Sequence, residues 1–346
     1  MGHENRILQL IVLAALSTGM LHAQNSSASS PSKQEFVPVE KDVKLEVLDW
    51  GGTGRPLIFL AGMGNTAHNY DKFAPQFTAK YHVYGITRRG FGASSKPTPT
   101  STNYTADRLG DDVLAVMDAL KLDRPVLVGH SFAGEEMSSI GSRYPERVAG
   151  LIYLEAAYGF AYYDPAHPMM ELEMNDLKRR IDRLEAGGVD EKSYLLDLEA
   201  RVSEFAKTLH DSNLGVASMP PIPPRPPIQA ALNYGAEEYT KIPVPILAIY
   251  ACPHNWDRAF QNDPAMKAKR LTADIASCTA QADAFAAGVP SAHVVRIPNA
   301  DHYVFLSNEA EVVREMNAFL SKLDASTTAP HSSESAGPSN PAAHPR

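Results

Sequence analysis

Residues 125–134 read Pro125-Val126-Leu127-Val128-Gly129-His130-Ser131-Phe132-Ala133-Gly134. A short apolar run ends in Gly-His-Ser, and small residues with a helical pattern follow it. This order predicts a buried strand, a sharp turn with Ser131 at its apex, and a helix. Small neighbours are needed because the serine backbone is strained and the helix packs close to the strand. The strain would hold the hydroxyl out into a cleft, where a histidine can take its proton.

The composition is that of a globular protein with a substantial core. The chain has 346 residues, of which 44% are hydrophobic, enough for one large α/β domain or two ordinary ones. The formal net charge is −8 and no basic stripe occurs, so nucleic acid is not an expected partner. We find no metal-binding motif and no nucleotide-binding loop, and we therefore expect no cofactor.

The first residues are typical of an export signal. Arg6 precedes the apolar stretch 7–20, and Ala23 offers a small residue for cleavage before Gln24. The apolar part is shorter than the roughly 20 residues that a comfortable membrane span needs. We therefore predict a signal peptide over 1–23, with an uncleaved anchor as the alternative. This prediction implies a periplasmic or extracellular protein without a stable membrane span.

Composition also divides the rest of the chain. A Ser-rich spacer over 24–35 and a Ser-, Pro- and Ala-rich tail over 325–346 are expected to be flexible. Strands alternate with helices over 36–157 and 241–324, which predicts an α/β core with a mostly parallel sheet covered by helices on both faces. Residues 158–240 carry two amphipathic helical stretches and a proline run. They predict a helical lid inserted between two late strands.

Hydrophobic periodicity places the individual elements. Strands are predicted at 43–48, 56–60, 81–86, 125–130, 148–154, 244–250 and 293–297, the first of them exposed or at a sheet edge. Helices are predicted at 105–120, 168–186, 191–210 and 308–323, with Thr105 capping the first. The run Met219–Pro227 is read as a stiff connector within the insertion, with a ligand for a signalling module as the alternative.

The two cysteines are Cys252 and Cys278. In an exported protein two cysteines can form one disulfide, which here would tie the loop after a strand to a following helix. The sequence does not give their distance, so two unpaired buried thiols are the alternative.

Four segments together resemble the α/β-hydrolase superfamily, in the order that this family has them. They are Leu60–Gly64, Arg88–Ser94, Gly129–Gly134 and Asn299–His302, each expected at the end of a strand. The resemblance covers nearly all of 40–324 and implies the α/β-hydrolase fold. Ligands of such folds bind outside the carboxyl ends of the strands.

The resemblance implies a catalytic triad. Ser131 would be the nucleophile and His302, on the loop after the last strand, the general base. The acid is implied at Glu155, after the strand 148–154, as in those haloalkane dehalogenases that use a glutamate there. Asp257 is the alternative acid, because the more common site is the loop after the strand 244–250, where His254 or Asn255 takes the usual place of an aspartate. Among the other polar residues, His130 is expected to point away and pack, and Asp301 to have a surface role.

An oxyanion hole of two backbone amides is also implied, those of Met63 and Phe132. Many relatives have His-Gly at 61 and 62, where this chain has Ala-Gly. Because the proposed donor is a main-chain amide, alanine in place of histidine at position 61 should leave the oxyanion hole intact. A second departure is Ala133 at the last motif position, which is small enough for close packing.

A serine nucleophile argues against the dehalogenase and epoxide-hydrolase branches, whose nucleophile is an aspartate. The resemblance then implies acyl transfer to water through an acyl-enzyme, first of all on a carboxylic ester of a small molecule. Lactonase, amidase, perhydrolase and carbon–carbon cleavage activities use the same groups. A non-catalytic protein that binds a small molecule under the lid is the alternative, and the oligomeric state stays open. The insertion begins with residues that indicate either an acyl pocket or a packing seam: Tyr158, Phe160, Tyr162, Tyr163, Met169 and Met170.

Overall fold

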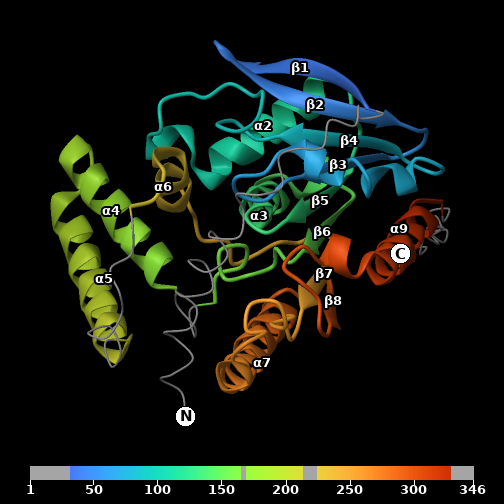
Figure 1. Cartoon of the computed structure of the whole chain (residues 1–346). Coiled ribbons are helices and arrows are strands. Elements are labelled where there is room, and N and C mark those ends of the chain that lie inside the picture. Colours follow the sequence, from blue (N-terminus) through green and yellow to red (C-terminus); the bar gives the residue numbers. More distant parts are fainter. Residues whose placement is uncertain (1–31, 165–168, 213–223, 329–346) are drawn as a thin grey trace, which may run out of the picture.

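The computed structural model describes residues 32–164, 169–212 and 224–328 (Figure 1). The predicted signal peptide, most of the predicted spacer and most of the predicted tail lie outside the described residues, as does the first part of the proline run. Among the helices described, none combines the length and the apolar character that crossing a bilayer requires.

Eight strands of the described part of the chain form one sheet in the order β1-β2-β4-β3-β5-β6-β7-β8. Antiparallel pairing joins β1 to β2 and β2 to β4, and all other neighbours are parallel. The strands are β1 (Lys33–Glu40), β2 (Val43–Gly51), β3 (Pro56–Leu60), β4 (His82–Thr87), β5 (Val126–His130), β6 (Gly150–Leu154), β7 (Ile246–Ala251) and β8 (Ala292–Ile297). Because the parallel strands end at one edge, the residues that follow β5 to β8 gather there.

The central strands are apolar on both faces. In β3, Ile58 and Leu60 pack into one core cluster, whereas Leu57 and Phe59 pack into the other on the opposite face of the sheet. All four side chains are buried. This is the pattern of a parallel sheet that helices cover on both sides.

Helices cover the two faces of the sheet (Figure 1). One face is covered by α2 (Ala106–Ala119), α3 (Ala133–Arg143) and α7 (Pro264–Gly288), and the other by α8 (Val304–Ser307), α9 (Glu309–Thr328) and the short helices η2 (Ala67–Tyr70) and η3 (Ala74–Phe77). Thr105 caps α2 as predicted, since its side chain accepts a hydrogen bond from the amide of Arg108 at 3.0 Å. The remaining short helices are η4 (Ser101–Asn103) and η5 (Pro145–Arg147).

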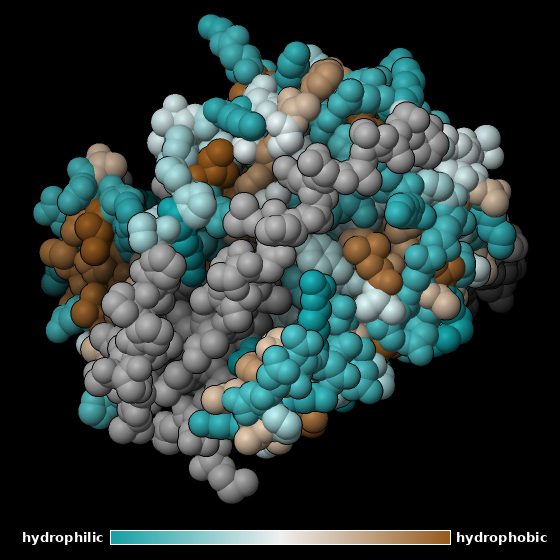
Figure 2. Space-filling model, viewed as in Figure 1, coloured by the Kyte–Doolittle hydropathy of each residue, from teal (hydrophilic) through white to brown (hydrophobic). Residues whose placement is uncertain are grey.

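Three helices follow β6 and precede β7: α4 (Met170–Ala186), α5 (Glu191–Ser212) and α6 (Pro227–Tyr234). The first two pack on each other and extend away from the sheet (Figure 1). Figure 2 shows apolar side chains gathered on their outer surface; the exposed ones are Met174, Ile181, Leu195, Leu196 and Val202. The sequence did not predict α6, which Pro227 begins at a position where proline loses no helical hydrogen bond.

The structure differs from the prediction at the start of the sheet. The strand predicted at 43–48 as exposed or at an edge is β2, and it is largely buried because β1 covers its outer side. β1 begins at Lys33, inside the predicted spacer 24–35. Val37 is buried in the core, and Glu40 forms an ion pair with the buried Arg89 at 2.9 Å. These contacts order a segment whose composition alone is polar.

The last helix also exceeds its predicted end. α9 continues to Thr328, into the predicted tail. Asp324 accepts hydrogen bonds from Arg55 at 3.1 Å and from Tyr81 at 2.9 Å, and Leu323 is buried. Tertiary contacts therefore hold the final turns.

Candidate active site

Ser131 lies at the sharp turn between β5 and α3 with a φ of 54°. This left-handed conformation is strained for a residue with a side chain. Two glycines permit the turn. A Cβ atom on Gly134 would lie 2.0 Å from the carbonyl oxygen of Ala156, and one on Gly129 would lie 2.7 Å from Cε of Met137. The contact at Gly134 is the tighter of the two and involves backbone, so residue 134 is the position of this turn that has no room for a side chain.

The hydroxyl of Ser131 is partly exposed and has no hydrogen-bond partner among the described residues. His130, next to it, is buried and its Nε2 lies 2.9 Å from the carbonyl oxygen of His302. The two imidazole rings are 4.7 Å apart. Burial first, and then the charge of His302, lower the pKa of His130 to about 3. His130 is therefore a neutral donor that ties the serine turn to the loop of His302.

His302 lies on the loop between β8 and α8, and its ring is largely buried. Its Nδ1 is 3.2 Å from Oε2 of Glu155. An ionised carboxylate only accepts hydrogen bonds, so Nδ1 carries the proton and Nε2 is left to act as a base.

Glu155 follows β6 directly, has a φ of 51° and is fully buried. Its Oε2 accepts hydrogen bonds from Tyr158, His254 and His302, and its Oε1 accepts one from the amide of Ala251. Burial by itself raises the pKa of Glu155. The charge and hydrogen bond of His254, and then those of His302, outweigh burial and hold this pKa well below its usual range.

The alternative acid lies elsewhere. Asp257 is highly exposed and forms an ion pair with Lys267 on α7. Asp301 is likewise exposed. The structure thus brings Glu155 and not Asp257 to His302.

The sequence analysis gave His254 no role, yet the structure places it on Glu155 with Nε2 and Oε2 2.9 Å apart. Two signals were available. His254 follows β7, the neighbour of β6, where the family usually has an acid. A carboxylate at the end of a buried strand also needs a donor or cation beside it.

The loop of Met63 passes against the serine turn. A Cβ atom on Gly62 would lie 3.2 Å from Cβ of Ser131 and 2.9 Å from Nδ1 of His130. The amides of Met63 and Phe132 donate to no acceptor among the described residues. Two main-chain donors are thus available beside the hydroxyl, which is what an oxyanion hole needs.

Arg88 connects the two segments that carry these amides. Its guanidinium forms a bidentate ion pair with the buried Glu136 at 2.8 and 2.9 Å. It also donates to the carbonyl oxygen of Ala61 at 2.8 Å and lies 5.3 Å from the centre of the Phe132 ring. Burial raises the pKa of Glu136, and the charge of Arg88 opposes this. The pair therefore links α3 to the Met63 loop.

Apolar side chains surround the oxyanion side. Met63 and Phe132 share a hydrophobic cluster with Phe91 and, on α6, Ile228. Phe91 and Ile228 also line an open groove of about 460 Å³, whose one charged lining residue among those described is Lys96. The inserted helix α6 thus borders the candidate site.

The aromatic residues that begin the insertion form a packing seam. Phe160 is buried and its ring lies 6.2 Å from that of Phe132. Tyr162 packs on Phe285 of α7, with ring centres 5.9 Å apart. Tyr163 donates a hydrogen bond to Glu173 of α4, and Met169 packs beside Tyr163; the side chain of Met170 lies outside the described part.

A family model described as the alpha/beta hydrolase fold matches residues 55–190, which include the serine turn. The strand order and the place of Ser131 at the carboxyl end of β5 agree with that match. The chain has the α/β-hydrolase fold.

Curated relatives match this chain over part of their length. A putative non-heme haloperoxidase of Mycobacterium phage D29 is 30% identical over 114 residues, which are 33% of this chain and 40% of that protein. The 3-oxoadipate enol-lactonase 2 of Acinetobacter baylyi is 32% identical over 118 residues, 34% of this chain and 43% of that protein. The matched segment spans less than half of either relative.

A solved structure extends the likeness to most of the chain. The thermophilic esterase from Thermogutta terrifontis superimposes with a TM-score of 0.53 at 17% identity, covering 84% of this chain and 99% of the esterase. At that identity the likeness shows the fold alone. The chemistry of this chain therefore rests on its own residues.

Glu155, His254 and His302 are also the described residues that come nearest to a metal site, with ligand atoms within 4.8 Å of one another. Ligands about 2.0 to 2.1 Å from a tetrahedral zinc ion lie roughly 3.3 Å apart. His254 Nε2 and Glu155 Oε2 are closer, at 2.9 Å, and both His254 and His302 are hydrogen-bonded to this same oxygen. The spacing fits hydrogen bonds better than coordination of a metal ion.

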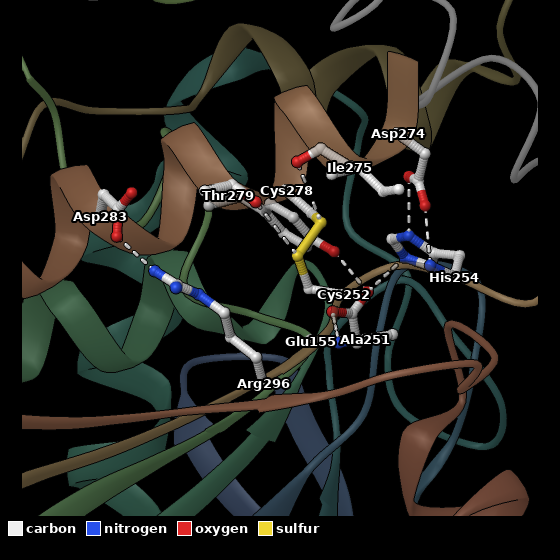
Figure 3. Close-up of a disulfide and its surroundings, with 11 residues drawn as sticks. Glu155, Ala251, Cys252, His254, Asp274, Ile275, Cys278, Thr279, Asp283 and Arg296 are labelled. Carbon is white, nitrogen blue, oxygen red and sulfur yellow. Dashed lines mark hydrogen bonds and ion pairs between the residues drawn. A yellow bond between two sulfur atoms is a disulfide. The ribbon is translucent and has the colours of Figure 1, made fainter. Parts of the chain in front are cut away.

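Cys252 and Cys278 form a disulfide with their Cα atoms 5.6 Å apart (Figure 3). The bond ties the loop after β7 to α7, which are the two elements that the sequence analysis expected it to join. It lies near Glu155 and His254 (Figure 3). A disulfide of this kind persists in an oxidising compartment.

Proposed function

We propose that this protein is a serine hydrolase that cleaves a carboxylic ester of a small molecule through an acyl-enzyme. One observation carries the proposal. The strained Ser131 has an unpartnered hydroxyl and lies beside the unused amides of Met63 and Phe132. Its neighbour His130 contacts the buried His302, which Glu155 holds. Such an arrangement of nucleophile, base and oxyanion donors is the template for acyl transfer.

In the proposed reaction, His302 acts first as general base and then as general acid. Its Nδ1–H stays on Glu155 while Nε2 takes the proton of the Ser131 hydroxyl. The serine oxygen attacks the ester carbonyl, and Nε2 then gives the proton to the leaving alcohol. Water repeats the sequence on the acyl-enzyme, releasing the acid and restoring the serine. The hydrogen bond between a catalytic serine and its histidine often tightens only when substrate is bound.

The two free amides supply electrostatic stabilisation. Those of Met63 and Phe132 would donate to the oxygen that becomes negative in the tetrahedral intermediate. Phe132 immediately precedes α3, so the positive end of the helix dipole adds to the effect.

The substrate side is proposed to be apolar. Met63, Phe132 and Ile228 belong to one apolar cluster beside the proposed oxyanion donors, and Ile228 also forms part of the apolar lining of the groove beside α6. We therefore expect an ester with an apolar acyl or alkoxy group. The helices α4 to α6 are proposed to act as its lid, because α6 borders this lining.

Export is a further part of the proposal. The Cys252–Cys278 disulfide supports a periplasmic or extracellular location, where such a bond is maintained. N-terminal sequencing of secreted material would find a new terminus at Gln24 if the signal peptide is cleaved after Ala23.

Replacement of the nucleophile tests the proposed function. Ser131→Ala should abolish hydrolysis of short p-nitrophenyl esters, while circular dichroism shows an intact fold. Ser203→Ala, an exposed serine on α5, is the matched control and should retain full activity. A panel of esters, lactones and amides of varied acyl length would define the substrate class. Unreduced turnover by Ser131→Ala would remove this serine from the mechanism.

A further inference from the structure

His254 lies between two buried carboxyl groups. Its Nε2 is 2.9 Å from Oε2 of Glu155, and its Nδ1 is 2.9 Å from Oδ1 of Asp274 on α7 (Figure 3). The backbone amide of His254 also donates to Oδ2 of Asp274 at 2.7 Å. The residue is largely buried. Water therefore has little access to either ring nitrogen.

The chemistry of these partners fixes the protons. Ionised carboxylates have no proton to donate, so each ring nitrogen that faces one must be a donor itself. A neutral imidazole has one donor and one acceptor nitrogen and would leave one contact without a proton. Two carboxylate partners therefore require the imidazolium form of His254.

We propose that His254 is a positioning residue of the catalytic site, a permanently cationic imidazole that donates to both Asp274 and Glu155 and thereby holds the acid ionised and oriented towards His302. This role rests on the proposed function, since Glu155 acts through His302. The result is an extended chain of four groups, Asp274–His254–Glu155–His302, in place of the usual acid–base pair.

The covalent framework keeps the two ends of this chain in place. Cys252 lies two residues before His254, and Cys278 lies one helical turn after Asp274. The disulfide thus joins the His254 loop to α7 beside the hydrogen-bonded pair (Figure 3). His254 also pairs with Ala300 as an isolated parallel bridge, which connects it to the loop that carries His302.

All charged and titratable groups near His254 fit a cation at this place. Glu155 and Asp274 are its direct partners, and Tyr158 donates to the same oxygen of Glu155. The like charges are more distant in the network. Arg270 of α7 lies 4.3 Å from the ring centre of Trp256 and is attracted by Asp274, while His302 shares Glu155 with His254.

The electrostatics support the same protonation state. Burial alone lowers the pKa of His254, but the charges and hydrogen bonds of Glu155 and Asp274 raise it to about 10. The pair of His254 and Asp274 adds one positive and one negative charge, so the cluster keeps the net charge of an ordinary acid. Oε2 of Glu155 thus gains a second imidazole donor, and the cluster gains no net negative charge.

Nitrogen-15 NMR of histidine-labelled protein tests the protonation directly and does not depend on activity. At pH 7.5, the resonances that disappear in His254→Gln should show two protonated ring nitrogens. A single protonated nitrogen, with the other of the unprotonated type, would overturn the proposal. If no substrate is turned over at all, the proposed function fails while this experiment still decides the state of His254.

The kinetic arm tests the positioning role. His254→Gln keeps one donor but removes the charge, and should lower kcat about ten- to hundredfold, the rate equivalent of one charge-assisted hydrogen bond. Loss of a cation near His302 favours its protonation, so the acid limb of kcat/KM should move up by about one pH unit. Asp274→Asn removes one anion together with the cation that it stabilises, so it should shift the limb less than His254→Gln does. His293→Gln, exposed on β8, is the matched control.

A purely structural role predicts a different pattern. It would lower the yield or the melting temperature of both variants and leave the pH profile of the folded fraction unchanged. Full kcat together with an unshifted acid limb in His254→Gln would overturn the positioning role.

Discussion

One oxygen atom, Oε2 of Glu155, accepts hydrogen bonds from Tyr158, His254 and His302. Such a carboxylate is a poor base and a rigid acceptor. It is therefore suited to orient the imidazole of His302 and, in the proposed reaction, to stabilise the imidazolium without taking up the proton itself.

Glu155→Gln tests this arrangement. The amide can present a donor to Nδ1–H of His302 and favour the wrong tautomer, so kcat should fall by about 10³- to 10⁴-fold, as triad-acid replacements do elsewhere. Asp257→Asn is the matched control and should leave kcat unchanged. Steady-state kinetics on one ester measure both. Loss of activity in Asp257→Asn and not in Glu155→Gln would move the acid to residue 257.

The sequence pointed to Ser131, Met63, Phe132 and His302 through motif segments and to Glu155 through its place after a strand, but it gave His254 no role. Ser131, Met63, Phe132 and His302 lie in segments with fixed neighbours, so their places could be predicted. His254 has no such context. Its role arises because Asp274 of α7 and Glu155 after β6 approach it from two sides, a tertiary arrangement that one sequence does not display.

At the scale of elements, the Met63 loop is held tightly against the serine turn. Gly62→Ala would place a Cβ atom 2.9 Å from Nδ1 of His130 and must displace the loop. The displacement moves the Met63 amide, so kcat should fall by about a hundredfold, the low end for a lost oxyanion donor. Gly187→Ala, where a Cβ atom meets nothing within 4 Å, should keep full kcat. Equal kcat in the two variants would argue against the oxyanion role of this loop.

The disulfide between the β7 loop and α7 is the second constraint at this scale. Replacing Cys252 and Cys278 by alanine should lower the free energy of unfolding by about 3 kcal/mol, because the unfolded chain loses a cross-link over a loop of this length. Urea denaturation with and without a reductant would measure the difference. An identical midpoint for the oxidised protein and the double variant would contradict this expectation.

Elements with strong apolar patterns were predicted well, and those stabilised by partners were not. The strand 56–60 coincides with β3, since it is buried on both faces. In contrast, β1 is mostly exposed and α6 begins within prolines. Each gains its order from a tertiary neighbour, β2 for the strand and the Met63 cluster for the helix.

At the scale of the whole molecule, four adjacent strands deliver the site. Ser131 follows β5, Glu155 follows β6, His254 follows β7 and His302 follows β8, in the same order as the strands lie in the sheet. Parallel strands end at one edge, so residues more than a hundred positions apart meet there. The fold class implies this edge, whereas the proximity of Glu155 rather than Asp257 to His302 became visible only in the structure.

The buried charges also make the stability of the whole molecule depend on pH. The folded pKa of His254 is about 10, above its unfolded value near 6.5, so its stabilisation is complete below about pH 6.5 and is lost as the pH rises towards 10. The lowered pKa values of Glu155 and Asp274 act in the opposite direction, and their contribution is lost as the pH falls below about 4.

Denaturant unfolding between pH 4 and pH 10 would measure this dependence. Wild type should be most stable between about pH 5 and 6.5 and should lose stability on the alkaline side. His254→Gln should be less stable at pH 6 and show a flatter alkaline limb. Parallel curves for the two proteins from pH 6 to 10 would show that His254 does not titrate with folding.

The central claim is that Ser131 is a nucleophile activated by His302. Mass spectrometry after exposure to a fluorophosphonate probe tests it most directly, because the probe reacts with activated serines whatever the natural substrate is. We predict a single adduct on the peptide that contains Ser131 in wild type, and adduct formation slowed by orders of magnitude in His302→Asn. An unlabelled Ser131 in folded wild type, or equal labelling in the two proteins, would contradict the account.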